Sequence, residues 1–197
     1  VYQDVVRYAP INGNGTLGAW SLTTSFSTAR SEHVAVVCNG YLYVIGGFGG
    51  AFQSDVQYAP IRADGTVGAW TATSSFSGGR QNHAAVAYQG HLYVLGGLTA
   101  GSITQNDVQY APINANGTLG PWSSTASFAT PRGSHTAVAN GGYLYVIGGV
   151  GPTLGFVDYK SDVQCAPINA GGTIGTWVTT TSFPTARIEH TSVAYKG

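Results

Sequence analysis

Arginine and histidine recur at matching positions along the sequence, and they are the side chains best suited to chemistry. Each arginine of the set Arg30, Arg80, Arg132 and Arg187 is followed three residues later by a histidine. A guanidinium binds carboxylates and other anions through paired hydrogen bonds, so these arginines are candidate ligand-binding residues. A guanidinium can also hold backbone carbonyls of its own loop. A charge that appears once in every repeat favours this second, structural role.

The histidines raise the question of a metal site. They are His33, His83, His135 and His190. Zinc needs its ligands at about 2.0–2.1 Å from one centre, and equivalent positions in separate repeat units are too far apart for that. The sequence has no H-x-H or H-x-x-x-H pair and no cysteine near these histidines in the repeat frame. We therefore expect neither a metal nor another cofactor.

Nucleophilic catalysis finds no support in the sequence either. Cys38 and Cys165 occupy repeat positions that do not face each other, which predicts two free thiols. The sequence lacks the G-x-S-x-G turn of serine hydrolases. Asn14 and Asn116 match the glycosylation sequon, but both lie at a tight turn whose geometry accounts for them. These observations predict a protein that is not an enzyme.

Composition narrows the class of partner. The 197 residues carry eight basic and eight acidic side chains, with a charged fraction of 8%. A neutral chain of this kind is unsuited to electrostatic binding of nucleic acid or membrane surfaces. No stretch approaches the length of about 20 apolar residues that a membrane span needs. Only two lysines are present, and Ser, Thr, Gly and Asn fill the polar positions, which predicts an extracellular or cell-surface location.

The elements that must position these side chains follow from an internal repeat. Trp20, Trp70, Trp122 and Trp177 are spaced by 50, 52 and 55 residues, and the arginines and histidines keep the same spacings. In the second complete unit, strands are predicted at residues 83–88, 92–95, 108–113 and 119–124. Tight turns such as Gln89-Gly90 and Asn116-Gly117 separate them. Four antiparallel strands in a period of about 50 residues predict the blades of a β-propeller.

The repeat resembles the kelch-repeat β-propeller family, in the form of bacterial-type kelch-like repeats. The resemblance rests on the double glycine that ends the second strand, as in Gly46-Gly47, on a tyrosine in the third strand, on the tryptophan and on the Arg-x-x-His motif. Cys165 departs from the pattern by replacing the third-strand tyrosine. The resemblance implies an all-β propeller whose relatives are mostly binding modules. A minority, resembling galactose oxidase or sialic-acid isomerases, are enzymes, and the copper constellation of the former cannot be assembled from these residues.

We predict one propeller array over residues 1–197. Its repeat units are approximately 1–32, 33–82, 83–134 and 135–189, followed by a partial strand at 190–197. With strands lettered a to d from the axis outward, the sequence starts at strand c and ends at strand a. One blade is therefore expected to be split across the termini. Such an array is either part of a larger propeller or a subunit that other chains complete.

A ligand face is predicted where the connections vary. The b–c loops, at residues 48–54, 98–106 and 150–161, differ in length, and they share one face with the d–a loops that carry the arginines. Aromatic side chains on that face suit carbohydrate or peptide capture. The candidate ligand-binding residues are Phe48, Phe52, Phe156, Tyr159, Arg30, Arg80, Arg132 and Arg187. An alternative interpretation is that these aromatic rings pack on the blade edges.

These observations predict a non-catalytic binding module of a secreted or surface protein, with a protein or carbohydrate ligand. The first alternative is a self-assembling propeller subunit, a homo-oligomer completed by strand exchange. The second alternative is a fragment of a kelch-type enzyme. Nucleic-acid binding and membrane insertion are not expected.

Overall fold

The structure is a computed structural model that describes residues 2–152 and 158–195. All regular secondary structure in these two segments is β-strand. Strands of three to ten residues, separated by glycine-rich turns, agree with the alternating pattern of turns and apolar runs in the sequence. No helix of the described part is long and apolar enough to cross a membrane.

Three antiparallel sheets of four strands form the body of the molecule. Blade I consists of β3 (Val34–Cys38), β4 (Tyr41–Ile45), β5 (Val56–Pro60) and β6 (Thr71–Thr73). Blade II consists of β7 (Ala84–Tyr88), β8 (His91–Thr99), β9 (Ile103–Pro112) and β10 (Ser123–Thr125). Blade III consists of β11 (Thr136–Asn140), β12 (Tyr143–Ile147), β13 (Val163–Pro167) and β14 (Val178–Thr180). A two-stranded sheet of β1 (Val6–Tyr8) and β2 (Ser21–Thr23) precedes them.

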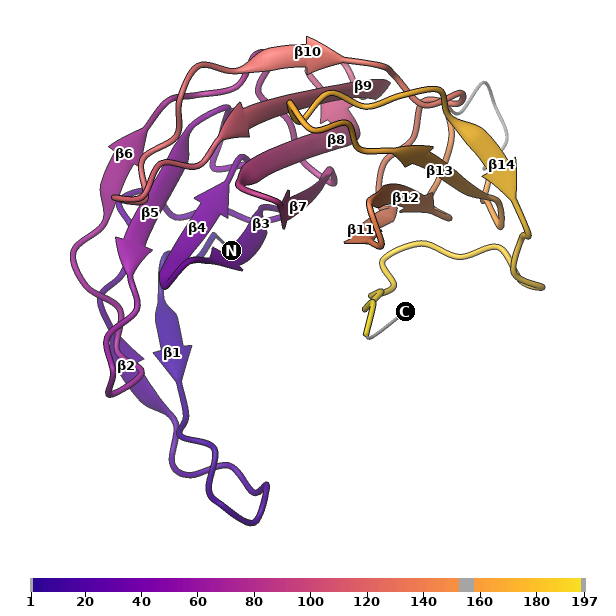
Figure 1. Ribbon diagram of the computed structural model, residues 1–197. Helices are drawn as coiled ribbons and strands as arrows, with labels where there is room; N and C mark the ends of the chain where they lie inside the picture. The colour runs from indigo at the N-terminus through magenta and orange to yellow at the C-terminus, as the bar shows by residue number, and fades with distance from the viewer. Residues whose placement is uncertain (1, 153–157, 196–197) are drawn as a thin grey trace.

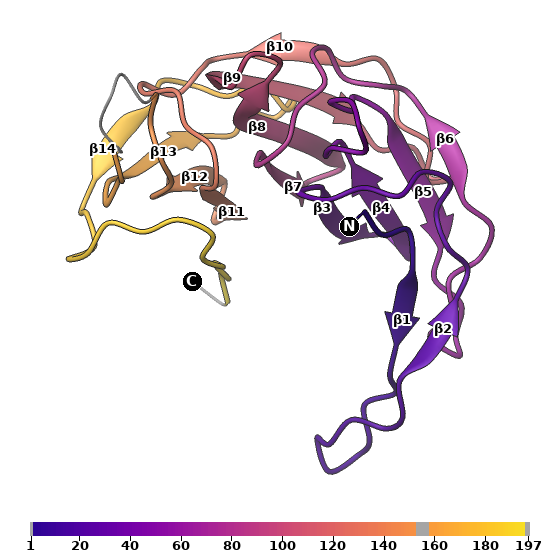
Figure 2. The same cartoon turned by 180° about the vertical axis from the view of Figure 1, so that it is seen from behind.

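The sheets stand side by side along an open arc (Figure 1). The innermost strands β3, β7 and β11 face the concave centre, and the outermost strands β6, β10 and β14 lie on the rim, as the reverse view also shows (Figure 2). This arrangement confirms the predicted all-β fold with kelch-like four-stranded blades. The arc does not close into a ring.

The predicted split blade is not assembled. The β1–β2 sheet and the C-terminal segment lie at opposite ends of the arc (Figure 1). Residues 190–195, predicted to be a strand, form no β-ladder. In the complete blades the innermost strand forms its ladder with strand b of the same blade, as β3 does with β4. A strand needs such a partner for its backbone groups.

Two strand boundaries in blade II differ from the prediction. Residues 98–106, predicted to be a loop, extend β8 and β9 into a two-stranded ribbon in which Leu98 pairs with Thr104 and Thr99 with Ile103. Thr and Ile favour this extended conformation. The outermost strand starts at Ser123, because the preceding Leu119 bridges Ile113 in the c–d turn.

The hydrophobic core lies between neighbouring blades. Leu92 and Val94 on β8 are fully buried and pack against Tyr43 and Ile45 on β4. Leu144 and Val146 on β12 continue the same layer against β8 and β9. The central strand β8 is therefore covered on both faces, and blades I and III each bury one face of their second strand against blade II. Because the blades pack tightly against each other, the ends of the connecting loops are held in fixed positions.

Candidate functional site

The b–c and d–a connections meet on one face of the array, which we call the loop face. Isolated antiparallel bridges join Ser31 to Phe48, Gln81 to Leu98, and Gly133 to Val150. Each bridge ties the loop before an innermost strand to the loop after its neighbouring strand b. The same attachment thus occurs in all three blades, while the side chains and lengths of the attached loops differ.

Three of the four candidate arginines are buried beneath the loop face. Arg132 donates from Nη1 and Nη2 to the two carboxylate oxygens of Asp162, at 2.9 Å each, and from Nη1 to the Gly148 carbonyl at 2.9 Å. Arg30 and Arg80 make the equivalent pairs with Asp55 and Asp107. The exposed fraction of these three arginine side chains is at most 3%. Their guanidinium groups have internal partners that anchor strand b to strand c.

The same contacts shift the pKa of two of these carboxylates, Asp162 and Asp55. Burial alone would raise the pKa of Asp162, but hydrogen bonds from Arg132 and Gln164 and the nearby guanidinium charge lower it below the usual value. The pKa of Asp55 is lowered in the same way, with Arg30 and Gln57 as the donors. Both groups therefore remain ionised within the folded blades at neutral pH.

Arg187 is exposed, unlike its three equivalents. Its guanidinium carbon lies 5.0 Å from the Phe183 ring centroid, and Nε donates to the Thr185 carbonyl at 3.2 Å. Within the described residues, no carboxylate forms a salt bridge with it. Its guanidinium is therefore the one of the four candidates that faces solvent.

An aromatic cluster lies on the loop face of blade I. The ring centroids of Phe48 and Phe52 are 5.1 Å apart, and Tyr2 joins them at 5.9 Å from Phe48. Phe48 and Phe52 are half-buried, whereas Tyr2 is 43% exposed. Tyr2 is absent from the sequence-based set because it precedes the first strand. A bridge from Gln3 to Arg30 brings it onto this face.

The remaining aromatic candidates belong to blade III. Tyr159 is 51% exposed and bridges Val150, so it lies on the loop face but in a different blade from Phe48 and Phe52. Beside it, Lys160 pairs with Asp158 at 2.6 Å. Phe156 falls outside the described residues. The structure thus brings together the blade I pair, with Tyr2 added, and leaves Tyr159 apart from it.

A chain of backbone hydrogen bonds links the d–a loops across the blades. Asn82 N donates to the Glu32 carbonyl at 3.3 Å, Ser134 N to Asn82 at 2.9 Å, and Glu189 N to Ser134 at 3.1 Å. All four residues have φ between 52° and 54°. This left-handed conformation is uncommon for residues other than glycine and is enriched at functional sites. The loop face therefore carries a row of polar residues held in fixed backbone geometry.

Three of the four repeat histidines line the concave side of the arc. A cavity of about 330 Å³ is bordered by the starts of β3, β7 and β11 and includes His83, His135 and His190. His83 and His135 are only 5% exposed, and neither ring has a well-formed hydrogen bond. Burial, together with Arg80 or Arg132 nearby, lowers the pKa of each to about 3. Both imidazoles are therefore neutral in the folded protein.

These neutral histidines predict loss of stability in mild acid. Their pKa is about 3 when folded and 6.5 when unfolded, so the unfolded state binds protons more readily, and stability falls as pH drops below 6.5. From pH 7 to pH 5 the free energy of unfolding should fall by about 2 kcal/mol for each histidine. Urea unfolding at both pH values measures this change. His83→Gln should remove one such contribution, and His83→Gln/His135→Gln should remove two. A double variant with undiminished acid sensitivity would contradict the assignment.

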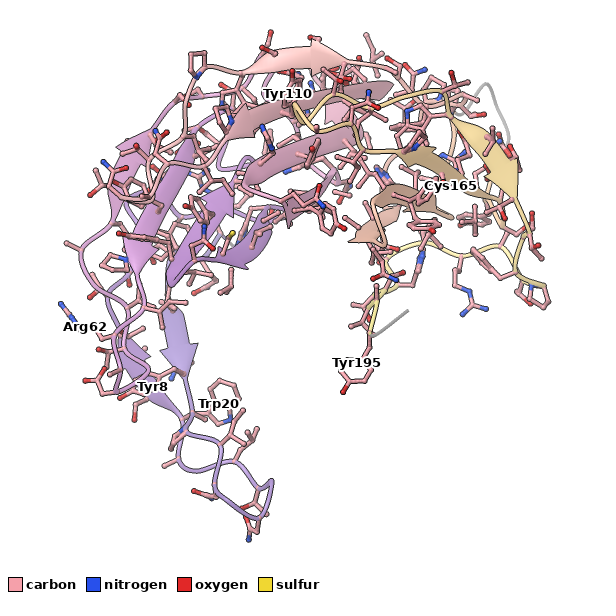
Figure 3. All side chains as sticks on the ribbon, in the orientation of Figure 1. Tyr8, Trp20, Arg62, Tyr110, Cys165 and Tyr195 are labelled. Atoms are coloured by element: carbon pink, nitrogen blue, oxygen red, sulfur yellow. The ribbon has the colours of Figure 1, made fainter. Side chains whose placement is uncertain are left out.

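No group of three or more potential metal ligands occurs in the described part of the chain. Cys38 and Cys165 are both free thiols, as predicted. Cys38 lies at the end of β3, and Cys165 lies on β13 in blade III (Figure 3). Burial raises the pKa of the Cys38 thiol, which makes it a weaker nucleophile at neutral pH.

Comparison with known proteins agrees with this architecture. A family model of the kelch motif matches residues 29–58, the segment that contains Arg30, His33 and the double glycine of blade I. The solved structure of YjhT superposes with a TM-score of 0.69 at 14% identity, covering 95% of this chain and 72% of that chain. A search of curated proteins found no match to the sequence. These results confirm the kelch resemblance and the propeller fold, and at this identity the structural similarity establishes the fold alone.

Proposed function

We propose that this protein is a non-catalytic binding module, secreted or at the cell surface, that captures a protein or carbohydrate ligand on its loop face. The observation that carries the proposal is the contrast between a repeated, buried framework and the different loops attached to it. Functional residues often lie on loops that a rigid scaffold positions. Here the same arginine–aspartate pair and the same bridge recur in each blade, below loops of three different lengths.

The aromatic cluster of Tyr2, Phe48 and Phe52 is the proposed centre of ligand contact. Its rings are held edge to face by one another, and all three keep some exposed surface. Partly exposed rings offer a large apolar area at low entropic cost, which suits both sugar rings and peptide side chains. The polar row from Glu32 to Ser134 supplies hydrogen-bonding groups on the same face. Extracellular location is proposed from the low charge content alone.

The test is a binding screen with a matched pair of variants. Wild-type protein is probed on an array of immobilised neutral and acidic oligosaccharides and with a peptide-display library. Phe48→Ala/Phe52→Ala should lose more than about tenfold in affinity for any captured ligand, since buried aromatic anchors dominate such contacts. Tyr143→Ala is the control, because Tyr143 is a 46% exposed aromatic at the a–b turn, on the opposite side of the blades.

Equal capture by both variants would exclude the aromatic cluster as the binding site. Absence of any ligand in both screens would count against a binding module. Capture in only one of the two screens would decide between a carbohydrate and a protein ligand. Circular dichroism of each variant verifies that the blades remain folded.

A further inference from the structure

The junctions between neighbouring sheets repeat one set of contacts. Trp70 Nε1 donates to the Thr24 carbonyl at 2.8 Å, Trp122 Nε1 to Ser74 at 2.9 Å, and Trp177 Nε1 to Ala126 at 2.9 Å. In each case the tryptophan follows the c–d turn of one blade, and the carbonyl follows the outermost strand of the preceding sheet. Every junction therefore joins a sheet face that carries the tryptophan to a different kind of face, which carries the accepting carbonyl.

Two further contacts complete each junction between two four-stranded blades. The outermost-strand threonine accepts a backbone N–H from the next blade, as in Leu119 N to Thr73 Oγ1 at 2.8 Å and Ile174 N to Thr125 Oγ1 at 2.7 Å. The second-strand tyrosine donates to a c–d turn glycine, as in Tyr43 to Gly117 O at 2.9 Å. The same tyrosine contact recurs between Tyr93 and Gly172, also at 2.9 Å.

The first sheet presents one half of this contact set, which has no partner among residues 2–152 and 158–195. Trp20, Leu17 and Gly15 occupy the positions of Trp70, Val67 and Gly65; we call these three residues the tryptophan face. Leu17 is 56% exposed and Trp20 is 62% exposed. The residues equivalent to Leu17, namely Val67, Leu119 and Ile174, are 4–6% exposed. Trp20 lies at the β1–β2 end of the arc and Tyr195 at the other end (Figure 3).

Blade III presents the other half. Thr180 and Tyr145 occupy the positions of Thr73 and Tyr43; with the backbone of Thr181, they form what we call the threonine face. Thr180 is exposed and Tyr145 is half-buried, whereas Tyr43 and Tyr93 are fully buried. Within residues 2–152 and 158–195, neither the Thr180 nor the Tyr145 hydroxyl has a hydrogen-bond partner.

We propose that the threonine face of one copy of this chain binds the tryptophan face of a second copy, head to tail. The contacts needed are those already made at the internal junctions, and they use only the b and d strands of one partner and the c–d turn of the other. All of these elements are present at the two ends. This interface extends an established packing mode and requires no exchange of strands.

The contact set also dictates the symmetry of the assembly. A tryptophan face offers an indole N–H and a turn carbonyl, and its partner offers a backbone carbonyl and a tyrosine hydroxyl. Neither face complements itself, so the interface is heterologous and leads to a closed ring or an open filament. The two faces lie at opposite ends of an open arc (Figure 1).

Native mass spectrometry and sedimentation of the 197-residue chain test this proposal. Wild-type protein should associate at micromolar concentration. Trp20→Arg and Thr180→Arg should each weaken association more than about tenfold, because a tryptophan anchor is lost or a charge is placed in an apolar interface. An equimolar mixture of the two variants should form a heterodimer, since each keeps the one intact face that the other needs.

Ile103→Arg is the matched control, because Ile103 is 59% exposed on β9 away from both faces. It should associate like wild type. A wild-type chain that stays monomeric, single variants that associate normally, or a mixture that fails to form the heterodimer would each overturn the proposal. The ligand-binding proposal is tested separately, because Phe48 and Phe52 belong to neither face.

Discussion

Replacing Arg132 with methionine is expected to lower the free energy of unfolding by about 3–5 kcal/mol, the usual cost of removing one partner from a buried ion pair. The Arg132 side chain is fully buried and makes a bidentate pair with Asp162. Methionine keeps much of the volume but offers no donor. Asp162 then loses its cationic partner and keeps only the hydrogen bond from Gln164, and the carbonyls of Thr130 and Gly148 lose the Arg132 donor. Urea unfolding at neutral pH measures the change.

Arg187 provides the matched control for this substitution. It has the same place in its repeat and also lies against a phenylalanine ring, but it is exposed and has no carboxylate partner within the described residues. Arg187→Met should therefore change the free energy of unfolding by less than about 0.5 kcal/mol. Similar losses from both substitutions would show that the loop, rather than the ion pair, sets the effect.

Adding a second substitution at Asp162 separates the stability lost with the ion pair from the stability lost with the other contacts of Arg132. In Arg132→Met/Asp162→Asn the unpaired carboxylate is gone, so part of the lost stability should return. The double variant should be more stable than Arg132→Met by roughly 1–3 kcal/mol, the penalty of leaving a polar group unsatisfied. A double variant no more stable than the single one would place the cost in the other contacts of Arg132, such as that of its guanidinium with the Phe128 ring.

The blade architecture was predictable because the repeat encodes it several times. The double glycine after strand b, the tryptophan and the Arg-x-x-His motif each recur with the same spacing. A strand that is assigned wrongly in one repeat unit can therefore be corrected by comparison with the other units. The structural role of the arginines could be inferred for the same reason. Their partners Asp55, Asp107 and Asp162 open the c strands, and the ion pairs form between these repeated positions.

The features that escaped prediction are those found in one unit only. The ribbon at Leu98–Thr104 forms because its residues tolerate extended pairing, whereas neighbouring units of different sequence keep loops there. Tyr2 reaches the loop face through a single bridge from Gln3 to Arg30. Residues 190–195 resemble an innermost strand but form no β-ladder in the part of the chain that the structure describes. Long-range partners of this kind leave no periodic pattern in the sequence.

Gly96→Ala is the second substitution with a large expected effect, a loss of about 2–5 kcal/mol from backbone strain and overpacking together. Gly96 has φ +55° at the bulge that ends the core section of β8. A Cβ built there lies 2.9 Å from the Arg132 carbonyl, from His135 Cε1 and from Phe128 Cζ. Phe128 and Arg132 lie in the connection from β10 to β11, and His135 directly precedes β11. The methyl group would therefore push on the contact between blade II and the start of blade III.

Gly90→Ala separates the two causes. Gly90 also has a positive φ, of +76°, but a Cβ there meets nothing within 4 Å, so alanine incurs only the conformational cost of about 1–2 kcal/mol. The difference between the two variants in urea unfolding isolates the clash between blades. If Gly96→Ala lowers the free energy of unfolding by no more than Gly90→Ala does, the neighbouring groups can move aside without loss of stability. In that case Gly96 is needed only for its backbone conformation. The larger loss would show instead that this glycine is required because a neighbouring blade occupies the space of its side chain.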